Sequence, residues 1–238
     1  MRVSVVIPVF NEAATVASVV ETVRCLPLET QVIVVDDGST DDTRAVLARL
    51  EGDASILVIR QPHRGKGAAV RAAIPHVVGE IVVIQDADLE YDPADIPPLI
   101  APIASGVADV VYGSRLLGGR PQRAYLFWHL VGNKLLALIT NVLYNTTLSD
   151  IETGYKVFAA DVLRSLDLRQ DGFGIEAEIT AQVCRRGLRV YQLPIAYYGR
   201  GYAEGKKITW RDGVQAVSIL FVERVRRRAA AITPRQQE

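Results

Sequence analysis

The chain has 238 residues, of which 49% are hydrophobic and 23% are charged, and its 27 basic residues balance its 27 acidic ones. This length and composition are ordinary for a single globular α/β domain. The zero net charge gives no support for nucleic-acid binding. No uninterrupted apolar stretch is long enough for a membrane-spanning helix, and the amino terminus has no signal-peptide pattern.

The two cysteines, Cys25 and Cys184, have no spacing typical of a metal site or a redox motif. Both fall in apolar, helix-like stretches, so we expect two buried thiols in a reducing compartment. Together with the missing signal-peptide pattern, this predicts a cytoplasmic location.

The first half of the chain alternates short apolar runs with helix-like segments. Strands are predicted at residues 3–7, 32–35, 56–59, 81–84 and 109–112, and helices at 12–24, 41–50, 66–77 and 93–104. The strand runs are almost continuously apolar, as is typical of parallel strands that are covered on both faces. The alternation predicts βαβ units and a Rossmann-like, mostly parallel sheet with helices on both faces.

The second half of the chain is less regular. Helices are predicted at residues 125–144, 175–186 and 212–228, strands at 155–158 and 189–193, and a basic, glycine-rich loop at 199–207. Apolar residues recur at helical spacing through 212–228. No linker divides the chain, so we expect one domain over residues 1–232 and a polar tail at 233–238.

Polar residues directly follow three of the predicted parallel strands. They are Asn11 and Glu12 after the first strand, residues 36–41 after the second, and Asp86, Asp88 and Glu90 after the fourth. Ligands of open α/β sheets bind beyond the carboxyl ends of the strands, so these groups should converge at one edge. Carboxylates two residues apart suit Mg²⁺ or Mn²⁺, and such an ion can bridge the two phosphates of a nucleotide.

Two adjacent carboxylates, Asp36 and Asp37, end the second predicted strand. Gly38 permits a tight turn after them, and Ser39 or Thr40 can cap the next helix, which explains part of the motif. Adjacent like charges need a further reason. A nucleotide base or ribose hydroxyl that donates a hydrogen bond to one of them would supply it.

These motifs resemble glycosyltransferase family 2, whose members have the GT-A fold. The matching segments are residues 6–12, 34–41 and 86–88, and residues 64–67, 88–93, 113–115, 150 and 153–156 resemble the dolichyl- or polyprenyl-phosphate sugar synthase branch. The resemblance implies an inverting, metal-dependent transfer of a hexose. The donor would be a nucleoside diphosphate sugar of the GDP-mannose or UDP-glucose type, and the acceptor polyprenyl or dolichyl phosphate.

The resemblance also implies roles for single residues. Nucleotide-sugar binding is expected of Pro8, Asn11, Glu12, Asp37, Asp86 and Lys207, metal ligation of Asp86, Asp88 and Glu90, and catalysis of Asp88, Arg115 and Arg200. Lys66 stands at the start of a predicted helix, where it would either meet an anion of the donor or be an ordinary solvated lysine. The third glycine of a dinucleotide fingerprint is missing near it, which argues against a dehydrogenase.

The charges of the second half favour a phosphate acceptor. A hydroxyl acceptor needs a general base, whereas a phosphate is already ionised and needs cationic positioning. The acidic residues of this half include no adjacent pair: Asp150, Glu152, Glu176 and Glu178. We therefore assign Arg123, Lys134 and Asp150 to the acceptor site. Asp150 would be either a base or the holder of a basic side chain, and we favour the second role.

Two apolar helices could bring the chain to a membrane surface. Aromatic residues at 125–128 lie next to Arg123, and a cluster of arginines at 224–228 follows Phe221 and Val222. Packing of both helices on the sheet is the alternative. A peripheral contact at the inner face of the membrane, or a membrane-protein partner, would replace the transmembrane helices that many relatives carry.

Two other functions stay open at this point. The chain could be a family 2 enzyme that acts on a hydroxyl of a saccharide or small molecule. It could also be a non-catalytic donor-binding subunit of a membrane glycosyltransferase. The intact Asp86, Asp88, Arg115 and Arg200 argue against the subunit role.

Overall fold

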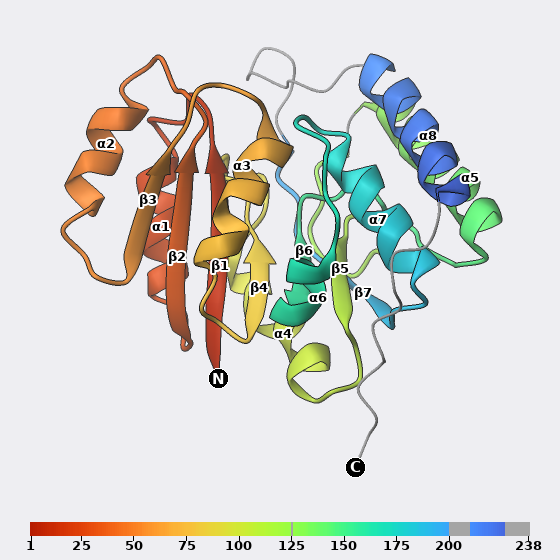
Figure 1. Ribbon diagram of the computed structural model, residues 1–238, viewed down its shortest axis with the longest axis horizontal. Coiled ribbons are helices and arrows are strands. Elements are labelled where there is room, and N and C mark those ends of the chain that lie inside the picture. The colour runs from red at the N-terminus through yellow and green to blue at the C-terminus, as the bar shows by residue number, and fades with distance from the viewer. Residues whose placement is uncertain (125, 200–209, 227–238) are drawn as a thin grey trace.

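The computed structural model describes residues 1–124, 126–199 and 210–226 (Figure 1). Within these residues one seven-stranded sheet has the order β3-β2-β1-β4-β6-β5-β7. Its strands are β1 Arg2–Val9, β2 Glu29–Asp36, β3 Ile56–Arg60, β4 Ile81–Ile84, β5 Val110–Ser114, β6 Lys156–Ala159 and β7 Val190–Pro194. Strand β6 is antiparallel to both of its neighbours and the other pairs are parallel. The prediction of a single α/β domain with a mostly parallel sheet is confirmed.

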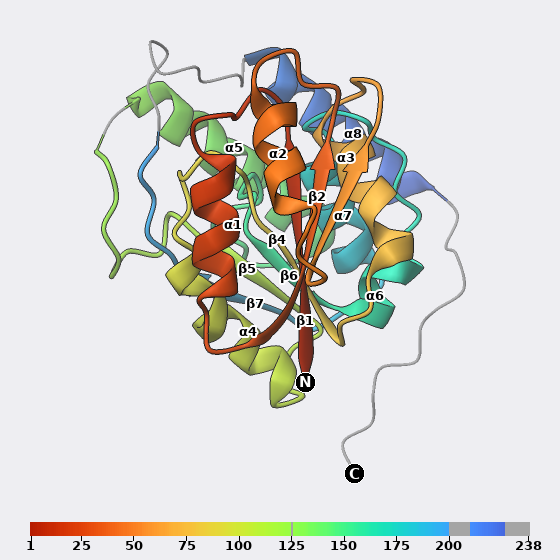
Figure 2. The same ribbon diagram turned by 90° about the vertical axis from the view of Figure 1, so that its left-hand side faces the viewer.

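Helices cover both faces of the sheet, as predicted. They are α1 Val16–Arg24, α2 Thr43–Leu50, α3 Lys66–Ala73, α4 Ile96–Ala104, α5 Phe127–Tyr144, α6 Ala160–Ser165, α7 Ile175–Arg185 and α8 Trp210–Val225, with short 3-10 helices η1 Ile74–His76 and η2 Pro93–Asp95. Figure 2 shows α1 and α4 on one face of the sheet and α3 and α6 on the other. Helix α8 packs against α7 and α5 at the end of the molecule far from β3 (Figure 1).

Most differences from the predicted elements lie at their ends. Helix α3 stops at Ala73 instead of continuing to residue 77, because Pro75 has no amide hydrogen for the helical ladder. Helix α1 begins at Val16, since residues 12–15 form a turn in which the carbonyl of Glu12 accepts the amide of Thr15. Helix α6 was not predicted, because six residues are too few to show a helical period.

Several predictions fall on segments that the structure does not describe. The predicted helix start at residue 125, the loop from residue 200 to 207 and the tail at 233–238 lie outside the described residues. The predicted helix at 212–228 is described as far as Val225.

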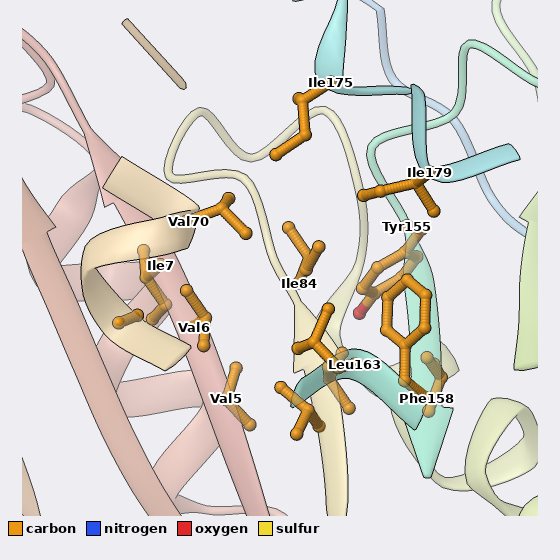
Figure 3. Packing of buried hydrophobic residues seen from close by; sticks show 14 of the residues in the cluster. Val5, Val6, Ile7, Val70, Ile84, Tyr155, Phe158, Leu163, Ile175 and Ile179 are labelled. Carbon is orange, nitrogen blue, oxygen red and sulfur yellow. The ribbon is translucent and has the colours of Figure 1, made fainter. Parts of the chain in front are cut away.

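A continuous hydrophobic core joins the sheet to the helices and fixes the strand ends relative to one another. Figure 3 shows Val6 of β1 and Val70 of α3 on the left, Ile84 of β4 in the centre, and Phe158 of β6 with Ile179 of α7 on the right. All five side chains are almost completely buried. Burying such a side chain contributes about 1.5–3 kcal/mol, so the core strongly favours a single register.

The register aligns the polar motifs at one edge of the sheet. Val9 at the end of β1 pairs with Asp36 at the end of β2, and Val6 pairs with Ile84 at the end of β4. The amide of Asp37 then donates to the carbonyl of Val9 at 2.9 Å. The residues that follow β1, β2 and β4 therefore start from neighbouring points.

Both cysteines are free thiols, with Cys184 partly buried and Cys25 exposed. The prediction of a buried thiol is wrong for Cys25. This residue follows the last turn of α1, whose buried face is formed by valines up to Val23. Among the described helices, none combines the length and apolarity needed to cross a bilayer.

Candidate active site

A cavity of about 920 Å³ opens at the carboxyl ends of β1, β4 and β5, a size suited to a nucleotide-sized ligand. Segments far apart in the chain form its wall. Its lining includes Pro8, Phe10, Glu12, Asp37, His63, Lys66, Asp86, Asp88, Glu90, Arg115, Arg123, Glu152, Gly154, Glu176 and Tyr197, together with Leu126, Leu130 and Asn133 at the start of α5.

The carboxylate of Asp37 is occupied by the protein itself. Its Oδ1 accepts hydrogen bonds from Gln61 Nε2 at 2.6 Å and from the amide of Arg64 at 3.0 Å. Its Oδ2 accepts the amide of Gly65 at 2.7 Å and lies 2.8 Å from His63 Nδ1. The Asp37 side chain is only 3% exposed, so its main action is to fix the turn at residues 61–65 beside the cavity.

The neighbouring Asp36 faces different partners. Its Oδ1 accepts the amide of Ser39 at 2.9 Å, and its Oδ2 lies 3.3 Å from Arg44 Nε. Gly38, with a left-handed φ of 76°, makes the turn that leads the chain from Asp36 to Ser39. Protein donors therefore account for the two adjacent carboxylates, and the expected nucleotide hydroxyl is not needed to explain the pair.

A chain of alternating buried charges forms the floor of the cavity. Lys66 Nζ lies 2.7 Å from Asp86 Oδ1 and 2.9 Å from Glu176 Oε1. The other oxygen of Glu176 pairs with the buried Lys156. Burial alone would lower the pKa of Lys66, but the Asp86 and Glu176 carboxylates raise it well above its usual value. Burial would raise the pKa of Glu176, but the two lysines hold it below its usual value.

Lys66 therefore binds anions, and these anions are the protein's own carboxylates, Asp86 and Glu176. The amino end of its helix is also covered, since the amide of Ala68 donates to the carbonyl of Asp171 at 3.0 Å. Lys66 consequently holds Asp86 in place at the cavity floor.

Gly154 packs directly against the pair formed by Lys66 and Asp86. A β-carbon at this position would overlap Asp86 Oδ2 and would lie 2.8 Å from Lys66 Nζ. The Gly154 amide also donates to the hydroxyl of Tyr91 at 3.1 Å. Only glycine allows the chain to approach the charged pair this closely.

Arg115 is held in the cavity wall by Asp150. Its Nε donates to Asp150 Oδ2 at 2.7 Å, its Nη2 donates to Oδ1 at 2.9 Å, and its amide donates to Oδ2 at 3.1 Å. The ring of Tyr197 lies 5.1 Å from the guanidinium carbon. Burial would raise the pKa of Asp150, but Arg115 keeps it below its usual value. Asp150 is thus ionised at neutral pH and holds a cation in position, the role favoured from the sequence.

Asp88 and Glu90 lie on the loop after β4 and line the cavity. The amide of Glu90 donates to Asp88 Oδ1 at 3.1 Å, and Glu90 Oε2 accepts the hydroxyl of Tyr197 at 2.9 Å. No cluster of three or more metal-binding side chains is preformed within the residues that the structure describes.

Glu152 differs from the other carboxyl groups of the cavity. Its Oε1 is enclosed and has no hydrogen-bond partner within the described part of the chain. Burial, reinforced by the negative charge of Glu176, raises the pKa of Glu152 to about 7.

A family profile described as Glycosyl transferase family 2 matches residues 4–166. The chain belongs to glycosyltransferase family 2. Among family 2 relatives, it is 32% identical to glycosyltransferase AglJ of Haloferax volcanii over 94% of this chain and 71% of that protein. It is 29% identical to undecaprenyl-phosphate mannosyltransferase of Micrococcus luteus over 87% of each chain.

The fold also matches solved structures. One is glucosyl-3-phosphoglycerate synthase of Mycobacterium tuberculosis in complex with Mn²⁺, UDP and phosphoglyceric acid. Its TM-score is 0.72 at 25% identity, over 94% of this chain and 78% of that one. The expected GT-A architecture is therefore confirmed.

The cavity brings together most of the site residues predicted from the sequence. They are Pro8, Glu12, Asp37, Lys66, Asp86, Asp88, Glu90, Arg115 and Arg123. Arg123 additionally donates to the carbonyl of Gly199 at 2.9 Å. Arg200 and Lys207 lie outside the described residues.

Three expected site residues do not line the cavity. Asn11 has a left-handed φ of 56°, and its Oδ1 accepts the amide of Thr40 at 2.8 Å, so its side chain stabilises the loop after β2. Lys134 is exposed, because a helix turns by about 100° per residue and its neighbour Asn133 is the one that faces the cavity. Asp150 is fully buried behind Arg115.

Three residues that line the cavity were not predicted from the sequence: His63, Glu152 and Glu176. The ring of His63 stacks on Phe10 with centroids 4.0 Å apart, and both rings line the cavity. A lone histidine in a loop carries no signal of such a contact. In the sequence, Glu152 and Glu176 are distinguished only as acidic residues of the second half, and their place in the cavity depends on tertiary packing.

Proposed function

We propose that this family 2 enzyme transfers a hexose from a nucleoside diphosphate sugar to a polyprenyl phosphate, with inversion at the anomeric carbon. The observation that carries the proposal is the Arg115 guanidinium, fixed at the cavity wall by two hydrogen bonds to the buried Asp150. Such a preorganised cation is suited to an anionic acceptor. The similarity to an undecaprenyl-phosphate mannosyltransferase supports the same acceptor class.

In the proposed reaction an oxygen of the lipid phosphate attacks the anomeric carbon on the side opposite the diphosphate. A carbon–oxygen bond to the acceptor forms while the carbon–oxygen bond to the β-phosphate breaks. The nucleoside diphosphate leaves with the electron pair of that bond. No base has to remove a proton, because the acceptor phosphate is ionised at neutral pH. Arg115 would offset the negative charge of the incoming phosphate.

We assign the nucleoside to the side of the cavity formed by Pro8, Phe10 and the turn at residues 61–65. The diphosphate would lie toward Asp86 and Asp88. Asp37 would then act on the nucleoside through the turn that it fixes, because protein donors already use both of its oxygens. Neither a guanine nor a uracil base is favoured by these contacts.

The cavity suits Mg²⁺ or Mn²⁺. Asp88, Glu90 and the second oxygen of Asp86 are hard oxygen donors near one another in the sequence, and Mg²⁺ is usually bound by one or two carboxylates together with substrate phosphates and water. A complete protein cage is therefore not required. When bound, the ion would neutralise charge on the departing diphosphate. The Mn²⁺ and UDP in the glucosyl-3-phosphoglycerate synthase structure support this assignment.

The outer face of α5 suits a membrane surface. Its exposed apolar residues are Phe127, Trp128, Val131, Leu135, Leu138 and Val142. The helix contains no acidic residue, and the basic Lys134 is exposed on it. The first turns of α5 also line the cavity through Leu126, Leu130 and Asn133. We propose that this helix rests on the bilayer, so that the lipid tail leaves the cavity along it.

The proposal is tested with purified protein, Mn²⁺, a short-chain polyprenyl phosphate and a panel of GDP- and UDP-sugars, with lipid products identified by mass. We expect a polyprenyl-phosphate hexose of inverted anomeric configuration from one donor. Turnover by the chain alone would also exclude the role of a non-catalytic subunit. Donor hydrolysis without any lipid product would contradict the proposed acceptor.

A hydroxyl acceptor is the second candidate, and Glu152 is the observation that favours it. A carboxyl group with a pKa of about 7 can act as a general base at neutral pH. Replacing polyprenyl phosphate with saccharide acceptors in the same assay tests this candidate.

A further inference from the structure

Glu152 lies midway along a short segment whose two ends hold different parts of the cavity. Two residues before it, Asp150 fixes Arg115. Two residues after it, Gly154 packs against the pair formed by Lys66 and Asp86. Glu152 lines the same cavity as Arg115, which is assigned to the acceptor, and Asp86, which is assigned to the diphosphate. In the proposed reaction the hexose has to lie between those two groups.

The carboxyl group of Glu152 has an enclosed oxygen that no described residue satisfies. A buried acceptor without a partner is destabilising, so such an atom needs a water, an ion or a ligand group to satisfy it. The charged groups that act on Glu152 are Glu176, Lys156, Arg115 and Asp150. The two cations among them donate elsewhere: Arg115 donates to Asp150, and Lys156 donates to the carbonyl of Ile151 and to Glu176.

A sugar hydroxyl matches this carboxyl group better than a phosphate does. An ionised Glu152 would repel a phosphate, whereas a hydroxyl can donate to an ionised carboxylate or accept from a protonated one. We infer that Glu152 is a sugar-specificity residue, whose carboxyl group hydrogen-bonds one hydroxyl of the donor hexose and so decides which hexose the cavity accepts. The inference rests on the proposed function, since it takes the ligand at this position to be the hexose of the donor.

The test is calorimetric binding with Mn²⁺ and without any acceptor. Its probes are UDP-glucose, UDP-galactose and GDP-mannose, the 2-, 3-, 4- and 6-deoxy derivatives of the best binder, and UDP and GDP alone. The proteins are the wild type, Glu152→Gln and Glu152→Ala. Glu178→Gln is the matched control, because Glu178 is a buried carboxyl group that receives the amides of Arg169 and Gln170 and does not line the cavity.

For the wild type we expect one deoxy donor to bind about 10- to 100-fold more weakly than its parent. In Glu152→Ala the affinity for the parent donor should fall by a similar factor. The affinity for that deoxy donor should not fall further. Glu152→Gln, which keeps the side-chain volume, should show the same pattern to a smaller extent. Affinity for UDP and GDP should stay unchanged in every variant, and Glu178→Gln should discriminate between donors as the wild type does.

Three results would overturn the inference. One is an equal loss of affinity for the free diphosphates and for every donor, which indicates a structural role. Another is unchanged discrimination between donors in both Glu152 variants, whether or not turnover is lost, because a general base would behave in this way. The third is that no nucleoside diphosphate sugar binds, which would contradict the proposed function too. If only the lipid-transfer assay fails, the binding measurement still tests the inference, because binding is measured without any acceptor.

Discussion

At the scale of single residues, the two ends of β5 carry the same kind of ion pair with different consequences. Asp150 binds Arg115 at the cavity end of the strand through two hydrogen bonds. Asp109 binds Arg189 at the opposite end, with Nη2 to Oδ1 at 2.7 Å and Nε to Oδ2 at 3.1 Å. The two pairs thus offer a matched comparison between a site contact and a structural one.

We predict that Asp150→Asn lowers sugar transfer about 100-fold, because the Arg115 guanidinium loses its fixed orientation. Donor binding should largely remain. Asp109→Asn should change the free energy of unfolding but leave the rate of sugar transfer close to that of the wild type. Assays at pH 7 and pH 9 separate the two roles considered for Asp150. Recovery of Asp150→Asn at the higher pH would contradict the account, since a positioning carboxylate does not act as a base.

The close approach of Gly154 to Asp86 gives a second prediction. Gly154→Ala should weaken donor binding roughly tenfold or more, because a methyl group there must displace the Lys66–Asp86 pair. The matched control is Gly52→Ala, where a β-carbon would meet no atom within 4 Å. Calorimetric titration with the donor measures both variants. Wild-type affinity in Gly154→Ala would show that this packing is unimportant for the site.

Glu152 gives a prediction for stability against pH. Its pKa is raised from 4.5 to about 7 in the folded protein, so folding favours its protonated form. This contribution is complete below about pH 4.5 and is lost as the pH rises to about 7, at up to about 1.4 kcal/mol per pH unit. Relative to Glu152→Gln, the wild type should therefore become less stable over that window. Urea unfolding of both proteins at pH 5 and pH 8 is the measurement. If the free energies of unfolding of the two proteins differ by the same amount at both pH values, the pKa of Glu152 is not raised.

At the scale of elements, the apolar outer face of α5 predicts association with anionic membranes. Changing both Leu138 and Val142 to Glu should weaken binding to anionic vesicles at least about tenfold, because it removes apolar area and adds repulsion. Val78→Glu is the control, since Val78 is similarly exposed but lies before β4. Vesicle sedimentation measures the effect. Equal binding by all three proteins would show that α5 does not face the bilayer.

The strands of the first half could be predicted because each is a continuous apolar run bounded by polar turns. The run at 81–84 matches β4 at both ends. The antiparallel direction of β6 could not be predicted, since a strand buried on both faces shows the same apolar pattern in either direction. Its neighbours in the sheet, β4 and β5, both precede it in the chain. Helix α4 follows β4 and helix α5 follows β5, so only tertiary packing decides that β6 inserts between the two strands.

At the scale of the whole molecule, the site residues at strand ends could be predicted and their partners could not. Asp86, Asp88 and Asp37 follow strands whose register the hydrophobic core fixes, so the pattern places them at one edge. The pairing of Lys66 with Asp86 and Glu176 joins α3, the loop after β4 and α7, and no spacing in the sequence encodes it. The hydrogen bonds to the Asp37 carboxylate likewise depend on tertiary packing, because their donors come from the turn after β3.

A paired acceptor assay tests whether the acceptor is a lipid phosphate. Purified protein, Mn²⁺ and one accepted donor are given either a short polyprenyl phosphate or the corresponding polyprenol, and the lipid products are identified by mass. The account predicts a sugar-bearing product from the phosphate and none from the alcohol, because Arg115 positions an anion and no base is needed. Comparable transfer to the polyprenol would contradict this expectation and would establish a hydroxyl acceptor.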